Sequence, residues 1–159
     1  MTANEDLSKI IDIIKDHPIA MLTTQGPEGL LSHPMTVLKV EDDGELWFFS
    51  SAGTTPVENI EQRAQVNVSF AAKDQWLSVQ GEAAVITSEP KARELWNPAV
   101  AAFYPDGPES PELRLVRVRP DGAEYWQTPG GTLATALSWA KARITGGKMN
   151  AGESHTVDL

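Results

Sequence analysis

The sequence predicts a mainly β protein, a small antiparallel β-barrel of about six strands with helices at its margins. Short β-rich runs at 19–25, 30–40 and 45–51 are separated by clusters of Asp, Gly and Pro. Such spacing is typical of antiparallel strands joined by tight turns. A parallel α/β fold would need regular alternation of strands and helices, and a pure sandwich would carry less helix.

The first helix is predicted at 2–18. Thr2 stands three residues before Glu5, the spacing of a capping box, and Pro18 marks the end. Apolar residues recur between them at helical spacing and form one stripe that packs on the rest of the fold: Leu7, Ile10, Ile11 and Ile14.

Three further segments have helical patterns. At 54–63, Thr54 or Thr55 is the expected N-cap, and Pro56 falls in the first turn. The segment 89–108 is helical material broken by Pro98 and ends in a loop rich in Pro and Gly. A last helix is predicted at 132–145, before a Gly-Gly pair.

The second half of the chain supplies the remaining strands. Segments 64–72 and 75–87 alternate as strands, and Gly81 is expected to form a bulge or bend. The residues 112–120 and 123–128 are predicted to form a hairpin around the Asp-Gly turn between them, and the tail 154–159 to add a short strand. No linker interrupts the chain, so a single domain over 1–159 is expected.

The composition narrows the class of protein. The formal charge is −9, from 22 acidic against 13 basic residues, which disfavours binding to nucleic acid or to an anionic membrane. There is no cysteine, so no disulfide, thiolate metal site or cysteine nucleophile is available. Neither a signal peptide nor an apolar run of about 20 residues is present, and we expect a cytoplasmic protein.

No catalytic motif stands out. His17, His33 and His155 lack metal-ligand spacing, so no metal site is expected, and neither GxSxG nor a Gly-rich phosphate loop occurs. The catalytic residues are therefore unknown at this point. What remains is a set of aromatic and proline-rich segments, "LWFFSS", "QWLSV", "LWNP", "AFYPDGP" and "AEYW", which core packing alone could explain.

Taken together, these segments resemble a known family. "HPMTV", "GELWFFSS", "VNVSF", "LSVQGEA", "ELWNP", "FYPDGP" and "AEYW" are similar to the general stress protein 26 group of the pyridoxamine 5'-phosphate oxidase-like FMN-binding split barrels. The resemblance runs from about Leu7 to about Trp126, and "LWNP", "FYPDGP" and "EYW" are its most specific part. It implies a six-stranded split barrel and a homodimer with a flavin at each of two interfacial sites.

The resemblance also implies positions for the flavin. A strand facing the ring, the end of a second strand beside it, and a phosphate-binding turn at a helix N-terminus are the expected elements. The matching residues are His33, Pro34, Met35 and Thr36 on the first strand, Phe49, Ser50 and Ser51 on the second, and Thr54, Thr55 and Pro56 in the turn.

Two of these positions depart from the family pattern. His33 stands where the family usually has arginine, and Pro56 where it usually has lysine. Losing two charge-assisted contacts costs roughly 1.5–3 kcal/mol each, or about a hundredfold to ten-thousandfold in affinity together. Other cations, from this chain or from a partner subunit, could compensate, and the candidates are Arg63, Arg114, Arg117 and Arg119. Arg117 and Arg119, which share a strand face with Leu113 and Leu115, are the first to examine.

Three functional readings remain open at the level of sequence. The first is a flavin-binding, stress-type protein, which as an enzyme would be an FMN-dependent oxidoreductase. The second is a split-barrel dimer that has lost the flavin and serves as a binding or structural protein. The third is a related ligand: FAD, a deazaflavin or haem, with His33 as the haem candidate. Pyridoxamine 5'-phosphate oxidation is not expected, because the region 132–159 lacks the arginine-histidine segment of the true oxidase.

Overall fold

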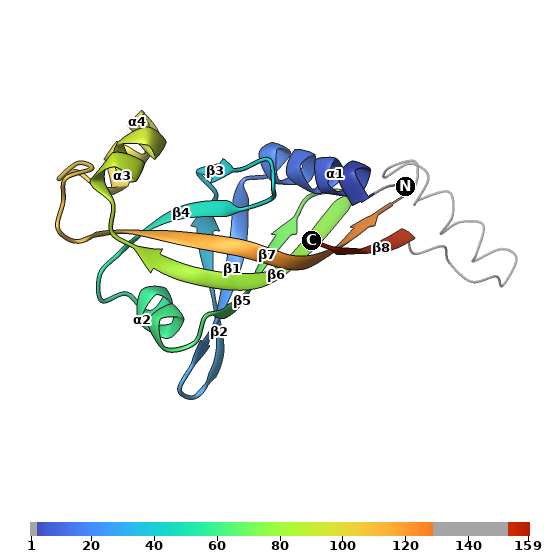
Figure 1. Ribbon diagram of the computed structural model, residues 1–159, viewed down its shortest axis with the longest axis horizontal. Coiled ribbons are helices and arrows are strands. Elements are labelled where there is room, and N and C mark those ends of the chain that lie inside the picture. The colour runs from blue at the N-terminus through green and yellow to red at the C-terminus, as the bar shows by residue number, and fades with distance from the viewer. Residues whose placement is uncertain (1–2, 129–152) are drawn as a thin grey trace, which may run out of the picture.

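The computed structural model describes residues 3–128 and 153–159, and one antiparallel sheet forms its centre (Figure 1). The sheet order is β2-β1-β5-β6-β7-β4-β3, and β8 pairs with β7. The strands are β1 Ile19–Gly26, β2 Gly29–Thr36, β3 Lys39–Val40, β4 Leu46–Ser51, β5 Gln65–Ala71, β6 Gln75–Ile86, β7 Leu113–Gln127 and β8 Glu153–Asp158. The helices are α1 Ala3–Asp16, α2 Thr55–Gln62, α3 Glu89–Leu95 and α4 Pro98–Phe103.

The mainly β architecture with peripheral helices is confirmed, but the number of strands is not. The sheet has eight strands rather than six, and it is not closed, because β2 and β3 stand at opposite ends of the hydrogen-bonded path. The run predicted at 30–40 is divided into β2 and the short strand β3. The final strand predicted at 154–159 is β8, whereas the helix predicted at 132–145 lies outside the described residues.

The hairpin predicted over 112–128 is wrong, because β7 is one continuous strand of 15 residues. From Leu115 to Gln127 it pairs with the 12-residue strand β6. The register shifts between Gln80 and Gly81: Gly81 faces Pro120 and Gln80 faces Gly122, so Asp121 is an extra residue. The Asp-Gly pair therefore forms a bulge and not a turn, and the bulge expected at Gly81 is confirmed.

The main core fills the inner face of the sheet. Its buried residues come from the central strands and include Leu22, Phe48, Val68, Val79 and Val116. Helix α1 adds Ile10, Ile13 and Ile14, so its buried stripe is rotated slightly from the predicted one. Helix α2 adds Val57 and Ile60. None of the described helices is long and apolar enough to cross a membrane.

A second apolar cluster lies on the other face of β4 and β7, under α3 and α4. Trp47, Phe49, Leu113 and Leu115 come from the strands, and Ala92, Leu95 and Val100 come from the helices. Successive strand residues point to opposite faces, so β4 contributes Phe48 to the main core and Phe49 to this cluster. The break predicted at Pro98 is confirmed, since α3 ends at Leu95 and α4 begins at Pro98.

We expect Gly81→Ala to destabilise the protein by about 1–3 kcal/mol, the range typical of overpacking. An added Cβ at this bulge would lie 2.1 Å from the carbonyl oxygen of Arg119, which is backbone of the paired strand. Urea unfolding measures the loss. Gln80→Ala, at an exposed neighbouring position, serves as the control with a change within about 0.5 kcal/mol. Equal effects of the two substitutions would show that the bulge does not require glycine.

Candidate functional site

An apolar pocket of about 270 Å³ lies between strands β2 and β4 and helix α4. Its lining combines an edge strand, a core strand and a covering helix, and none of the lining residues carries a charge. The lining residues are Pro34, Met35, Thr36, Leu38, Phe49, Asn97, Ala99, Val100, Phe103 and Tyr104. A pocket with these walls suits a flat, largely apolar ligand fixed by a few polar groups.

Strand β2 forms one wall, and its position explains Pro34. Among the described strands, β2 stands at the end of the sheet order and pairs only with β1, with Met21 opposite Pro34. An edge strand tolerates a proline because one of its sides makes no ladder hydrogen bonds. Pro34 and Thr36 are exposed and Met35 is half-buried, so the strand presents side chains that a ligand can contact.

The aromatic wall is built around Phe49. Its ring centroid lies 5.7 Å from that of Trp96 and 5.9 Å from that of Tyr104. The side chains of Tyr104 and Ser51 share a hydrogen bond, and burial raises the pKa of Tyr104 above its ordinary value, an effect which that hydrogen bond partly offsets. Asn97 caps α4, its Oδ1 accepting from Val100 N at 3.0 Å. Helix α4 is thereby fixed as the outer wall.

The end of β4 and the start of α2 form a hydroxyl-rich turn. Ser50 Oγ and Thr54 Oγ1 lie 3.1 Å apart, and the Thr54 hydroxyl donates to the Ser51 carbonyl at 2.8 Å. Thr54 is the N-cap of α2 as predicted, but its side chain makes no cap hydrogen bond. Thr55 is exposed, whereas the uncharged ring of Pro56 is buried. The first-turn amides of α2 therefore donate no hydrogen bond to the side chain of their N-cap residue.

The structure brings most of the residues implied by the resemblance into two neighbouring groups. Four of them line the pocket: Pro34, Met35, Thr36 and Phe49. Ser50, Ser51 and Thr54 form the hydroxyl-rich turn, which reaches the pocket through Tyr104. His33 and Pro56 are not lining residues. The Nδ1 atom of His33 is buried without a hydrogen-bond partner.

The residues that sequence reasoning missed come from α4 and its flanks. Asn97, Val100, Phe103 and Tyr104 all line the pocket, although the sequence assigned them no role. The signal was present, because "LWNP" and "FYPDGP" are the most specific part of the resemblance. Nothing local in those segments shows that they fold back over the edge strand.

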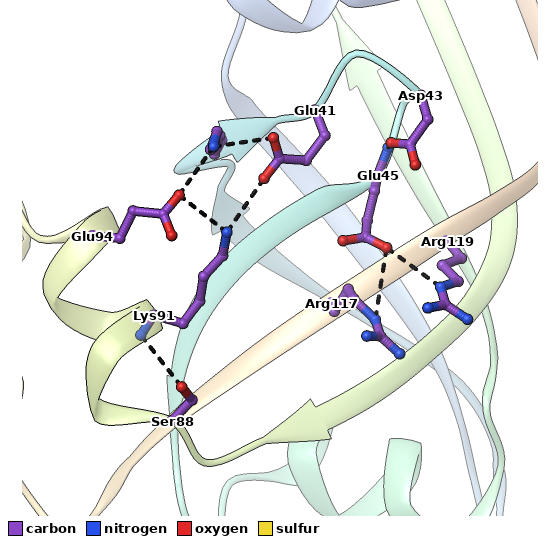
Figure 2. A network of polar contacts seen from close by, with 9 residues as sticks. Glu41, Asp43, Glu45, Ser88, Lys91, Glu94, Arg117 and Arg119 are labelled. Carbon is purple, nitrogen blue, oxygen red and sulfur yellow. Dashed lines mark hydrogen bonds and ion pairs between the residues drawn. The ribbon is translucent and has the colours of Figure 1, made fainter.

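A polar network holds α3, and with it α4, against the β3–β4 hairpin (Figure 2). Lys91 Nζ lies 3.3 Å from Glu41, 3.1 Å from Glu94, and 4.6 Å from the centroid of the Trp47 ring. Lys39 bridges the same two carboxylates, and hydrogen bonds to Glu41 and Glu94 raise its pKa. Hydrogen bonds from Lys39 and Lys91 lower the pKa of Glu94.

The four arginines proposed to compensate have different surroundings. Arg117 and Arg119 both contact Glu45, at 3.8 and 3.4 Å (Figure 2). Arg63 stands at the C-terminal end of α2, away from the hydroxyl-rich turn at its start. Arg114 of β7 lies directly opposite Ser50 of β4 in the strand register. Of the four arginines, Arg114 is therefore the one whose backbone lies beside the hydroxyl-rich turn.

Comparison with known proteins identifies the family of this chain. Residues 5–150 match the model of the family described as pyridoxamine 5'-phosphate oxidase like. The chain belongs to this family. Among curated proteins it is similar to Protein bli-3 of Neurospora crassa, with 24% identity over 156 residues, covering 90% of this chain and 75% of that protein.

Solved structures of general stress proteins are also similar. The general stress FMN/FAD binding protein of Xanthomonas citri is 31% identical with a TM-score of 0.71, covering 80% of this chain and 92% of that one. A Clostridium acetobutylicum protein related to general stress protein 26 of B. subtilis has a TM-score of 0.74 at 16% identity, covering 98% and 96%. The second likeness concerns the fold alone.

We expect Lys91→Met to lower the free energy of unfolding by about 1–2 kcal/mol. The substitution keeps the length of the side chain but removes the contact with the Trp47 ring and two ion pairs, which are worth up to about 2 and about 1 kcal/mol respectively. Chemical denaturation measures the change. Lys73→Met, at an exposed residue, is the control, and losses of the same size in both variants would rule out the Lys91 contacts as the cause.

Proposed function

We propose that this protein binds a flavin, with the ring in the apolar pocket and the phosphate at the hydroxyl-rich turn. The observation that carries the proposal is that Pro34, Met35, Thr36 and Phe49 meet in one pocket. The first three come from β2 and Phe49 comes from β4, and the resemblance assigns all four to the surroundings of the ring. Membership of the pyridoxamine 5'-phosphate oxidase-like family supports the same ligand class.

The residues present fit a flavin. The tricyclic ring needs apolar walls, which Met35, Leu38 and Phe49 supply, and polar groups at its edge, for which Thr36 and Asn97 are available. A phosphate needs donors, and the first-turn amides of α2 are candidates because the Thr54 side chain makes no cap hydrogen bond. The Ser50 and Thr54 hydroxyls lie beside them, with Thr54 donating to the Ser51 carbonyl. A helix N-terminus favours an anion through its unpaired amides and its dipole.

A bound flavin would supply the redox chemistry, accepting a hydride from a reduced nicotinamide or another donor. The part of the protein is to bind and orient the ring and to exclude water from one of its faces. Phe49, held by Trp96 and Tyr104, gives a rigid wall for this purpose. We assign no general acid or base, so the proposal is a flavin-dependent oxidoreductase whose electron donor and acceptor are unassigned.

FMN and FAD are both compatible with the pocket, since its walls contact the part that they share. The neighbour from Xanthomonas citri is described as binding either. The competing proposal is a barrel without flavin, which acts as a binding or structural protein. It is supported by the uncharged, buried Pro56 and by the imidazole of His33 in place of two cations.

We expect FMN to bind with a dissociation constant in the micromolar range or below. The quenching of flavin fluorescence measures the binding, and FAD is tested in parallel. Ala99→Trp would place an indole in the pocket from the exposed side of α4 and weaken binding at least tenfold. Ala101→Trp, exposed on the same helix but outside the pocket lining, is the matched control. No binding at a hundred micromolar would exclude the flavin proposal and favour the flavin-free reading.

We further propose that the protein is a homodimer. Large apolar side chains are exposed on β1, β2 and α4, with Ile19 68%, Leu30 71% and Phe103 82% exposed. Exposed apolar surface of this kind marks interaction sites. A second copy packed on the edge strand would also cover the open side of the pocket.

Light scattering is expected to give twice the mass of one chain. Leu30→Glu, which places a charge on the edge strand, is expected to shift the equilibrium towards monomers. Glu28→Gln, in the exposed turn before it, is the control. A monomeric wild-type protein at all concentrations would contradict the dimer.

A further inference from the structure

The hydroxyl-rich turn lacks the two cations that a flavin phosphate would need at positions 33 and 56. The Thr54 hydroxyl already donates to the Ser51 carbonyl and lies 3.1 Å from the Ser50 hydroxyl, so these side chains bring no charge to the turn. The net charge of −9 also repels a dianion. A site that retains affinity for FMN therefore requires a positive side chain from another element. The structure shows which of the cations lies beside this turn.

Arg114 stands directly opposite Ser50 in the antiparallel ladder between β4 and β7. Directly opposed residues project from the same face of a sheet, with Cβ atoms about 5 Å apart. Ser50 is only 6% exposed, and its hydroxyl contacts Thr54 at the start of α2. The side chain of Arg114 therefore begins beside the hydroxyl pair at which the phosphate is proposed to bind.

The guanidinium of Arg114 is also held in place. Its Nη1 donates to the carbonyl oxygens of Pro111 at 2.7 Å and Leu113 at 2.9 Å. The strand that carries these carbonyls runs beside the end of β4, where Ala52 N donates to the Glu112 carbonyl at 2.8 Å. These bonds use one terminal nitrogen, and no described residue accepts from Nε or Nη2 of Arg114. Those two nitrogens form an edge that suits two phosphate oxygens.

Of the other cations of the described chain, five contact carboxylates and Arg63 is distant. Lys9 and Lys15 are on α1 and Lys73 is between β5 and β6, elements that form no part of the hydroxyl-rich turn. Arg117 and Arg119 contact Glu45, while Lys39 and Lys91 contact Glu41 and Glu94. Arg93 pairs with Glu89 and Glu109. Arg63 follows the eight residues of α2, about 12 Å from its start at 1.5 Å per residue.

We propose that Arg114 binds the phosphate of FMN and replaces the cations absent at His33 and Pro56. The inference rests on the proposed flavin site and adds its ligand preference. A flavin that carries a phosphate binds more tightly than riboflavin, and the difference depends on Arg114. The ring contributes equally for both ligands, since the pocket walls contact no part of the phosphate.

The experiment titrates FMN and riboflavin against the wild-type protein, Arg114→Met and Arg119→Met. We expect the wild type to bind FMN at least tenfold more tightly than riboflavin. Arg114→Met is expected to lose tenfold to a hundredfold in FMN affinity, with riboflavin affinity changed less than twofold. Arg119→Met removes an equal charge from the same strand and is expected to leave both affinities within twofold.

Each outcome has a separate meaning. Equal affinity of the wild type for FMN and riboflavin, or an equal loss of both in Arg114→Met, overturns the role of Arg114 and leaves the flavin site. Binding of neither ligand to the wild type overturns the proposed function as well. Arg114→Lys covers the case in which the methionine variant does not fold. It keeps the charge but not the two-pronged edge, so FMN affinity is expected to fall while riboflavin affinity is unchanged. A folded lysine variant in which both affinities fall equally, or neither falls, would also overturn the inference.

Discussion

The burial of β4 on both faces is the constraint on which the rest of the structure depends. Leu46 and Phe48 pack into the main core, while Trp47 and Phe49 pack under α3 and α4. A strand that is apolar on both faces must be covered twice, so the helices after β6 fold back over the sheet. Without this second layer, Phe49 would face solvent and the pocket would have no outer wall.

The same strand connects the two parts of the proposed site. Phe49 belongs to the pocket, and the next residue along, Ser50, belongs to the hydroxyl-rich turn. The ion pairs of the polar network around Lys91 are partly exposed and contribute less to stability than the contact of Lys91 with the Trp47 ring. Its importance is geometric: it fixes α3 over Trp47, and α4 follows after only two residues. Packing supplies the energy of the second layer, and the ion pairs supply its orientation.

Much of the fold could be predicted from the sequence because its signals are local. The bulge at Gly81, the break at Pro98 and the N-cap at Thr54 each depend on one residue type in a short segment. The continuity of β7 could not be predicted in this way. Pro-Asp-Gly is a turn signal by itself, and only the long partner strand β6 makes it a bulge.

In the candidate site, too, some residues could be predicted from the sequence and others depend on long-range pairing. Pro34, Met35, Thr36 and Phe49 were implied by a resemblance that covers most of the chain. The contribution of α4 and the position of Arg114 beside Ser50 depend on how strands β4 and β7 pair and on where the helices fold back. Contacts between residues more than 60 positions apart have no local signature. The sequence therefore favoured Arg117 and Arg119, which contact Glu45 in the structure, whereas the register places Arg114 beside Ser50.

A crystal structure of the protein grown with FMN would locate both the ring and the phosphate. We expect the flavin ring to lie against Phe49 and Met35, with Tyr104 and α4 beside it and the phosphate near Ser50 and Thr54. A ring bound elsewhere, for example in the polar hollow lined by Asn67, Gln80 and Glu124 on the other part of the sheet, would contradict this expectation.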